Sequence, residues 1–469
     1  MMNDIEDLED VLDSLVFEEE PSVLTDECAV DIMITAFHLM DEYISEHPNA
    51  ISDPDFYETL LEEVKYMFYV QLEDHIWSND YIEDDVNDII EVAFDIYTTT
   101  FHTERSLQED AFLSEEESPE PISENTMLEN AVIAEKIRLL KELPQPVQRT
   151  PEWYKFRWNL ITASNAWKAF ESQSTMNQLI YEKCQPLKEY GGGGDGDGTE
   201  DKPVQMVNTN TTLHWGQKYE PLSVLLYEHL YGSKVEDFGC IQHPVYKFIG
   251  ASPDGIVTES TTGRYGRMLE IKNIVNREIN GIPKKEYWIQ MQLQMEVCDL
   301  DDCDFLETKF VEYPDYSSYK IDSIQSVDNG SEFNSLTTAK DGSYKGTIMY
   351  FHTKDGRPYY VYMPLDLWRP EDIAKWEEDT MHTYEGEYIF IKFIYWKLEK
   401  MSCVLVKRNR EWFEQNVHKL EKVWKIIEQE RVTGYEHRAP VRKQKPKVQP
   451  SYGAKDEVCF LKVVKLEST

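Results

Sequence analysis

Acidic residues are distributed unevenly along the 469 residues of this chain. Residues 1–150 contain 40 of the 88 Asp and Glu residues but only 6 of the 47 Lys and Arg residues, a net charge of −34. The remaining residues carry a net charge of only −7. Carboxylates repel one another and also repel the phosphates of nucleic acids. We therefore expect the first segment to form a separate acidic module, and the total charge of −41 does not exclude a nucleic-acid substrate for the rest.

The composition is typical of a folded protein. Apolar residues make up 41% of the chain and aromatic residues 12%, which is enough for a hydrophobic core. The seven cysteines are odd in number and form no Cys-x-x-Cys pair, which favours reduced thiols in a cytosol-like compartment. No apolar run reaches about 18 residues, and the first residues lack the pattern of a secretory signal. We expect a soluble intracellular protein with no membrane partner.

Two acidic stretches and one further helix are expected before residue 150. Apolar residues recur at three- and four-residue steps between residues 25 and 101, which predicts three or four helices within an acidic helical region, 1–101. That region is either a solvated module or a docking site for a basic protein. Residues 102–126 are poor in apolar residues and are predicted to be a disordered acidic linker. One more helix is predicted over residues 127–143.

A mixed α+β core with an α/β centre is predicted for residues 127–330 because strand and helix patterns alternate there. The glycine-rich run at 191–198 is predicted to be a flexible insertion. The expected strands lie at 235–239, 248–251, 255–257, 267–272 and 304–312, and the expected helices at 219–230 and 285–297.

Residues 331–433 are predicted to extend this core. A hairpin is expected from strands at 346–352 and 358–363, and a second strand pair from 388–396 and 402–406. A long helix is predicted over 410–431, followed by a basic, largely irregular tail at 434–469. Residues 397–447 contain 14 Lys and Arg against 7 Asp and Glu, so this part either follows DNA phosphates or is an ordinary helix with solvated charges.

One set of acidic residues has the spacing of a metal site. Asp254 lies in a Pro-Asp-Gly turn, and Glu270 and Lys272 follow sixteen and eighteen residues later on an apolar strand. Alternate strand residues point to the same face, so Glu270 and Lys272 are neighbours. Two carboxylates and a backbone carbonyl suit Mg²⁺ or Mn²⁺, and a lysine can orient a water molecule for attack on phosphorus. A turn aspartate beside a surface salt bridge is the alternative interpretation.

Five motifs in order carry a resemblance to a known family. They are EWYKFRWNLITAS, HWGQKYEP, GASPDGIV, LEIKN and YWIQMQLQM, all between residues 150 and 312. Together they resemble the YqaJ-like viral recombinases, which are lambda-exonuclease-like nucleases of the PD-(D/E)XK superfamily. The resemblance implies a restriction-endonuclease-like mixed sheet flanked by helices, and a source in a large DNA virus.

The resemblance also implies roles for individual residues. Asp254 and Glu270 would bind the metal with the backbone carbonyl of Ile271, and Glu220 would complete a site for two ions. Lys272 would position the nucleophilic water.

Two further groups follow from the same motifs. Arg157, Ser164 and Ser252 resemble the family's binders of a terminal 5′ phosphate. Gln290 and Gln292 lie where the family keeps a glutamine near the scissile phosphate. Residues two apart on a helix do not share a face, so at most one of these glutamines is expected to reach the site.

The implied function is that of a Mg²⁺- or Mn²⁺-dependent deoxyribonuclease, a 5′→3′ exonuclease on linear double-stranded DNA in viral recombination or repair. An endonuclease of the same fold and a non-catalytic DNA-binding or scaffold protein are the alternatives. Double-stranded DNA is the expected partner, with a single-strand-annealing or other basic protein at the acidic region and a homo-oligomer as further options. The host cytoplasm, a viral factory or the virion would be the location.

Overall fold

The computed structural model describes most of the chain and omits nine segments, including both ends. The described residues are 24–47, 53–72, 80–98, 124–147, 150–187, 208–209, 211–328 and 331–440. Several expectations therefore lie outside the description: residues 102–123 of the proposed linker, the glycine-rich run at 191–198 and the tail beyond residue 440.

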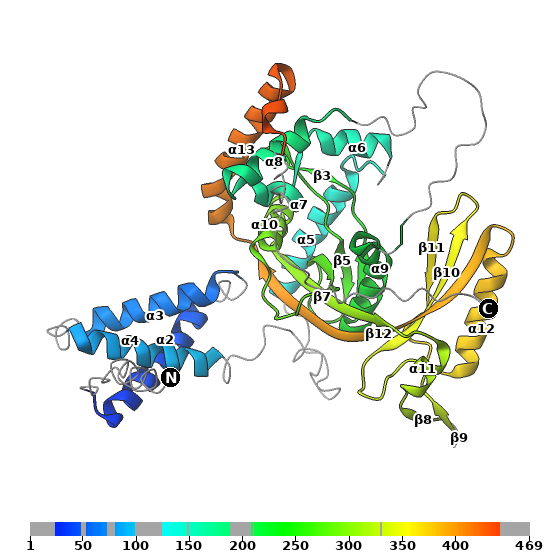
Figure 1. Ribbon diagram of the computed structural model, residues 1–469, viewed down its shortest axis with the longest axis horizontal. Helices are drawn as coiled ribbons and strands as arrows, with labels where there is room; N and C mark the ends of the chain where they lie inside the picture. Colours follow the sequence, from blue (N-terminus) through cyan, green and yellow to red (C-terminus); the bar gives the residue numbers. More distant parts are fainter. Residues whose placement is uncertain are drawn as a thin grey trace, which may run out of the picture.

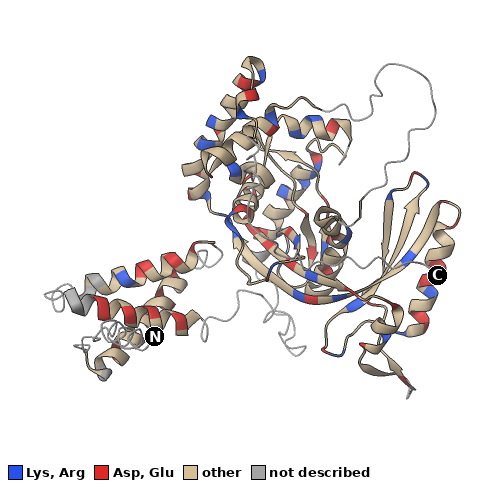
Figure 2. Cartoon of the chain, in the orientation of Figure 1, with Lys and Arg blue, Asp and Glu red and all other residues tan. Residues whose placement is uncertain are grey.

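Three helices occupy the acidic N-terminal region: α2 (Asp26–Glu46), α3 (Phe56–Leu72) and α4 (Asp80–Ile96). Their apolar stripes pack on one another around Ala36, Leu60 and Ile90, each with no exposed surface. Acidic residues are frequent along these helices, which lie beside the rest of the chain, and most of the described ones are exposed (Figure 2). The helical periodicity of the sequence predicted this arrangement correctly.

A mixed seven-stranded sheet is the centre of the molecule (Figure 1). Its strand order is β11-β10-β12-β7-β6-β5-β2, and only β6 and β7 are parallel. Helix α10 (Lys285–Cys298) connects these two strands, as a parallel pair requires. The mixed sheet flanked by helices agrees with the predicted fold class. The strands are β2 (Ser233–Glu236), β5 (Gly255–Ser260), β6 (Met268–Asn273), β7 (Asp302–Glu312), β10 (Lys345–Thr353), β11 (Pro358–Tyr362) and β12 (Tyr388–Lys407).

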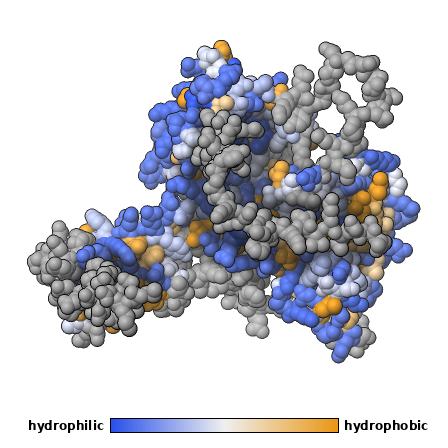
Figure 3. All heavy atoms as spheres, viewed as in Figure 1, coloured by the Kyte–Doolittle hydropathy of each residue, from blue (hydrophilic) through white to orange (hydrophobic). Residues whose placement is uncertain are grey.

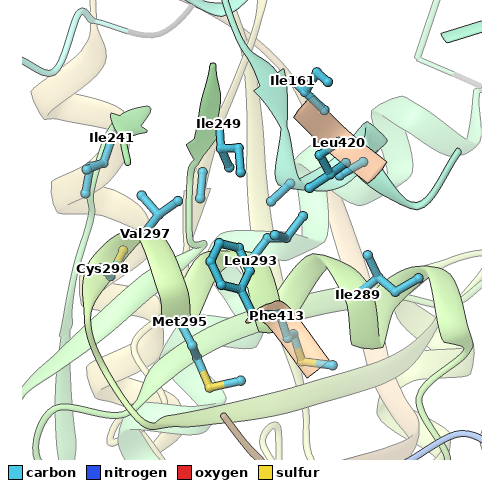
Figure 4. Packing of buried hydrophobic residues seen from close by; sticks show 14 of the residues in the cluster. Ile161, Ile241, Ile249, Ile289, Leu293, Met295, Val297, Cys298, Phe413 and Leu420 are labelled. Carbon is cyan, nitrogen blue, oxygen red and sulfur yellow. The ribbon is translucent and has the colours of Figure 1, made fainter. Parts of the chain in front are cut away.

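Two helices cover opposite faces of this sheet. Leu269 and Ile271 of β6 pack with Tyr227 of α9 (Thr212–Tyr231). Met268, the residue before Leu269, instead packs with the apolar side of α10. Figure 4 shows this second core, in which Leu293 lies among side chains from several elements. Alternation along β6 thus decides which residues face α10.

A second, three-stranded sheet lies against α10, in the order β1 (Ile161–Thr162), β4 (Ile249–Ala251) and β3 (Ile241–Gln242). Strands β1 and β4 are parallel. Around them are α5 (Glu124–Glu142), α6 (Pro151–Trp158), α7 (Ala163–Ala166), η4 (Trp167–Ala169), α8 (Gln173–Cys184) and α13 (Arg410–Thr433). Helix α5 begins at Glu124, so residues 124–126, assigned to the linker from their composition, are helical.

The C-terminal strands join the central sheet, and one prediction about them is wrong. Residues 388–396 and 402–406 are not a pair of strands but parts of the single strand β12. The first half of β12 pairs with β10 and the second half with β7. The predicted hairpin is present as β10 and β11. Further elements are α11 (Tyr316–Ile321), β8 (Gln325–Asp328), β9 (Ser331–Asn334), α12 (Pro370–Tyr384) and η5 (Glu436–Arg438).

Polar residues cover most of the described surface in the view of Figure 3, with small separate apolar patches. None of the helices within the described ranges has the length and apolar character needed to cross a membrane.

Candidate active site

Asp254 is held against strand β6 by two hydrogen bonds with the backbone of that strand. Its own N–H donates to the carbonyl of Leu269 at 3.0 Å, and its Oδ2 accepts from the N–H of Ile271 at 2.7 Å. Asp254 comes directly before β5, which pairs with β6. The Pro-Asp-Gly turn therefore fixes this side chain beside the strand that carries Glu270 and Lys272.

Glu270 and Lys272 lie on the α10 face of the sheet. Their side chains form an ion pair through Glu270 Oε1, and Glu270 has no exposed surface. The other carboxylate oxygen, Oε2, accepts a hydrogen bond from Gln294 Nε2 of α10 at 2.7 Å. Gln294 Nε2 also donates to the carbonyl of Ser252 at 3.2 Å. One glutamine thus ties β6 to the segment just before Asp254.

The charges at this point of the sheet do not balance. Burial raises the pKa of Asp254 well above its usual range, the negative charges of Glu270 and Glu220 add to the rise, and Lys272 opposes it. For Lys272, burial lowers the pKa, but Glu270 and Asp254 more than offset this and the net shift is upward. A single buried ammonium therefore faces more than one carboxylate. Such a site attracts a further cation.

Glu220 faces the same pocket from α9. The pocket has a volume of about 450 Å³ and is lined by Glu220, Ser252, Asp254 and Asp237, among others. Helix α9 is fixed to the end of β6 by Ser223, whose hydroxyl donates to Asn273 Oδ1 at 2.8 Å. This contact helps fix α9, which carries Glu220, beside the pocket that Asp254 also lines.

Arg157, Ser252 and Ser164 come from three neighbouring segments. Arg157 Nη1 donates to Ser252 Oγ at 3.5 Å, and its guanidinium lies 4.6 Å from the centre of the Trp153 ring. Ser164 is exposed at the start of α7, and its hydroxyl lies 3.4 Å from that of Thr162. Since β1 and β4 are parallel, Ser164 and Ser252 both follow the carboxyl ends of paired strands. Ser164 and Ser252 thus lie at the same end of the small sheet, and Arg157 reaches that end through its contact with Ser252.

Comparison with known proteins assigns the segment that carries this arrangement. Residues 152–301 match the family model described as "YqaJ-like viral recombinase domain". The chain is similar to this family over that segment. The segment contains every one of the side chains placed above.

Relatives of the whole chain are more distant. "Uncharacterized protein R354" of Acanthamoeba polyphaga mimivirus is 29% identical over 322 residues, which are 62% of this chain and 54% of that protein. The chain thus spans about half the length of this curated relative. A crystal structure of an alkaline exonuclease (LHK-Exo) from Laribacter hongkongensis is 17% identical with a TM-score of 0.31, covering 60% of this chain and 94% of that one. Its complex with dAMP gives 18% and 0.29, covering 61% and 95%.

The sequence predicted that at most one of Gln290 and Gln292 reaches the site and left the choice between them open. Gln292 points away from Glu270: its Nε2 donates to the carbonyl of Lys407 at 2.8 Å, and its Oε1 accepts from the N–H of Asn409 at 2.6 Å. Gln294, which was not singled out, reaches Glu270 instead. Gln290 is half-buried and shares the face of Gln294, because residues four apart are neighbours on a helix. Following that spacing one turn further along YWIQMQLQM would have identified Gln294.

The donor set suits a divalent cation that binds oxygen. Asp254 and Glu270 supply carboxylates, Ile271 supplies a backbone carbonyl between Glu270 and Lys272, and Gln294 Oε1 is buried without a hydrogen-bond partner in the described structure. Within the described ranges, however, no group of three or more His, Cys, Asp or Glu side chains is close enough to hold one ion. Two carboxylates thus converge here, and Glu220 faces them across the pocket.

Proposed function

We propose that the YqaJ-like domain hydrolyses phosphodiester bonds of DNA with the help of Mg²⁺ or Mn²⁺, with two ions at full occupancy. The observation that carries this proposal is the convergence of Asp254, Glu270 and Lys272 on one buried edge, where one ammonium faces an excess of carboxylate. Ions at these carboxylates would neutralise the charge that develops on the phosphate oxygens.

The protein side chains have separable tasks in this proposal. Lys272 lies at the edge of the buried cluster, with 24% of its side chain exposed, so its ammonium can orient a water molecule toward phosphorus. Gln294 holds Glu270 in a fixed orientation through a 2.7 Å hydrogen bond. Glu220, on the opposite side of the pocket, would complete the set of oxygen ligands.

Degradation of linear duplex DNA in the presence of Mg²⁺ tests the proposal. Wild type should digest the duplex, and Asp254→Ala and Lys272→Ala should not. Asp355→Ala is a matched control, because Asp355 is an exposed acid in the turn between β10 and β11. If the two site variants digest DNA as fast as the control, this site does not perform the reaction.

We further propose that the enzyme works as an exonuclease in the 5′→3′ direction. Arg157 and Ser252 contact each other at the edge of the pocket that contains Asp254, where they could bind a terminal phosphate. Covalently closed circles should then resist digestion, whereas an endonuclease of this fold would cut them.

The end preference gives a test that is specific to Arg157. Arg157→Ala should slow digestion of 5′-phosphorylated ends more than digestion of 5′-hydroxyl ends, because only the first lose a charge-assisted contact. If digestion of both kinds of ends slows equally, Arg157 does not bind the 5′ phosphate.

The acidic helices α2, α3 and α4 suit a basic protein partner rather than DNA. Most of their described acids are exposed, while their apolar residues are used in their own core. A chain that begins at residue 124 should therefore lose a basic partner, such as a single-strand-annealing protein, and keep its nuclease activity. If calorimetry shows that the shortened chain binds such a partner as tightly as the full chain does, the acidic helices are not its docking site.

A further inference from the structure

Glu307 of strand β7 is a buried carboxylate that the proposed reaction does not use. It lies in register with Lys272 on the neighbouring parallel strand, so both side chains point to the α10 face. Only 1% of its side chain is exposed. Its Oε1 accepts a hydrogen bond from Arg277 Nη2, and its Oε2 is buried without a hydrogen-bond partner within the described ranges.

Arg277 reaches this carboxylate from the loop between β6 and α10. About a quarter of its side chain, 26%, remains exposed. The ring of Tyr287 contacts both cations of this corner, with its centre 5.0 Å from Lys272 Nζ and 5.9 Å from the Arg277 guanidinium. Contacts with Glu307 and Tyr287 therefore hold Arg277 in the same corner as Lys272, with part of each cationic side chain in solvent.

The charge on this side of the site differs from that in the pocket. Burial raises the pKa of Glu307, whereas Arg277, Lys284 and Lys272 oppose the rise, so three cations act on one acid. The pocket that Asp254 lines has the further acids Glu220 and Asp237 in its lining and none of these three cations. A polyanion that approaches Asp254 would therefore find its attractive charge beside β7 and the start of α10.

The guanidinium has more donors than its protein partners use. Arg277 Nη1 donates to the carbonyl of Glu278 at 3.2 Å, and Nη2 donates to Glu307. An arginine carries five N–H donors in a planar fork that suits phosphate oxygens. A cation needed only to neutralise Glu307 would not have to keep a quarter of its side chain in solvent.

We propose that Arg277, held in place by Glu307, binds a backbone phosphate of the substrate DNA beside the bond that is cut. Glu307 is then a positioning residue that acts through Arg277. This inference rests on the proposed function, since it takes DNA as the substrate.

Binding of duplex DNA in EDTA, in which a metal-dependent nuclease cannot cut, tests the contact at several salt concentrations. Arg277→Ala should weaken binding on the order of tenfold at low salt and reduce the slope of log K against log salt by about one, the effect of losing one phosphate contact. Arg357→Ala is the matched control, because Arg357 lies in the β10–β11 turn with 75% of its side chain exposed and should leave the slope unchanged.

A double variant separates DNA binding from simple neutralisation of Glu307. Arg277→Ala alone leaves Glu307 buried and unpaired and could unfold the corner. Arg277→Met with Glu307→Gln removes both charges together and should keep the fold. If Arg277 only neutralises Glu307, this double variant binds DNA like wild type, and the inference fails; if Arg277 binds phosphate, the tenfold loss persists.

Methylphosphonate linkages identify the phosphate. One neutral linkage within two positions of the cut should weaken DNA binding by wild type. It should cause no further loss for the double variant, because the contact between Arg277 and that phosphate is already absent there. Equal losses for both proteins would overturn the contact. If wild type fails to cut DNA at all, the proposed function fails; if it cuts while the variants bind normally, only the present inference does.

Discussion

Two buried acidic clusters lie on opposite faces of the same sheet and are paired in opposite ways. On the α9 face, Asp304 has no exposed surface and receives Arg264 at 2.6 Å and Arg267 at 3.0 Å. The hydroxyl of Tyr227 donates to it as well, at 2.6 Å. Two cations and a hydroxyl thus surround one carboxylate.

On the α10 face the ratio is reversed. Asp254 and Glu270 share the single ammonium of Lys272. Burial alone therefore does not distinguish a functional carboxylate from a structural one, since both clusters are buried. The balance of charge does: an acid with a surplus of cations stabilises the fold, and acids with too few cations form a site for an ion that comes from solution.

The largest expected effect is on the reaction. Asp254→Asn should lower the rate of DNA hydrolysis on the order of a thousandfold or more, because the group that would bind the ion loses its charge. The same change should not lower the free energy of unfolding, because it relieves repulsion with Glu270. Digestion of a labelled duplex and urea unfolding of the same preparation measure both quantities. A large loss of stability would show that Asp254 belongs with Asp304 as a structural acid.

The opposite outcome is expected on the α9 face. Asp304→Asn should lower the free energy of unfolding by about 3–5 kcal/mol, because Arg264 stays buried without its counter-charge. Digestion per folded molecule should change little, since Asp304 faces away from α10. Urea unfolding gives the first quantity, and an assay on the folded fraction gives the second. If Asp304→Asn is stable but does not digest DNA, Asp304 is not the structural acid that the comparison with Asp254 requires.

A smaller contrast exists within helix α10. Gln294→Met should reduce hydrolysis about 10–100-fold, as is usual for groups that orient metal ligands, and should also lower the free energy of unfolding by about 1–3 kcal/mol, since the Glu270 carboxylate and the Ser252 carbonyl lose their donor. Gln292→Met should leave the rate unchanged and lower the free energy of unfolding by about 1–3 kcal/mol, since the Lys407 carbonyl and the Asn409 N–H lose their partner. The two variants are matched in chemistry and differ only in the direction of the side chain. Reversed results would restore Gln292 to the site.

The sequence predicted those features of the site that depend on local geometry. Asp254 lies in a turn, and Glu270 and Lys272 alternate on one strand, so their convergence follows from a period of two and a short connection. The choice among the glutamines does not follow from local rules. It depends on the rotation of α10, which is fixed by packing and by contacts with residues more than a hundred positions away.

Strand β12 gives the same lesson for the fold. The sequence predicted two strands, at residues 388–396 and 402–406, and the charged residues Glu399 and Lys400 lie in the stretch between them. In the structure the pairing register shifts between Leu398 and Lys400, so a bulge lies in this stretch and the strand continues. Partners on both sides, β10 and β7, keep it extended. Tertiary pairing of this kind is not encoded in the segment itself.

The smallest effect is expected where an acid is well paired but exposed. Lys397 Nζ lies 2.6 Å from Asp341 Oδ2, and 56% of the Asp341 side chain is in solvent. The hydrogen bond from Lys397, with one from the Ser343 N–H, lowers the pKa of Asp341 to about 2. The folded pKa lies below the usual 3.8, so the stabilisation is complete above pH 4 and is lost as the pH falls toward 2. Asp341→Asn should therefore lower the free energy of unfolding by at most about 1 kcal/mol at pH 6, and by less at pH 3. Urea unfolding at the two pH values measures this difference. A loss as large as that of Asp304→Asn would show that exposure does not weaken the pair, contrary to the comparison of the two buried clusters.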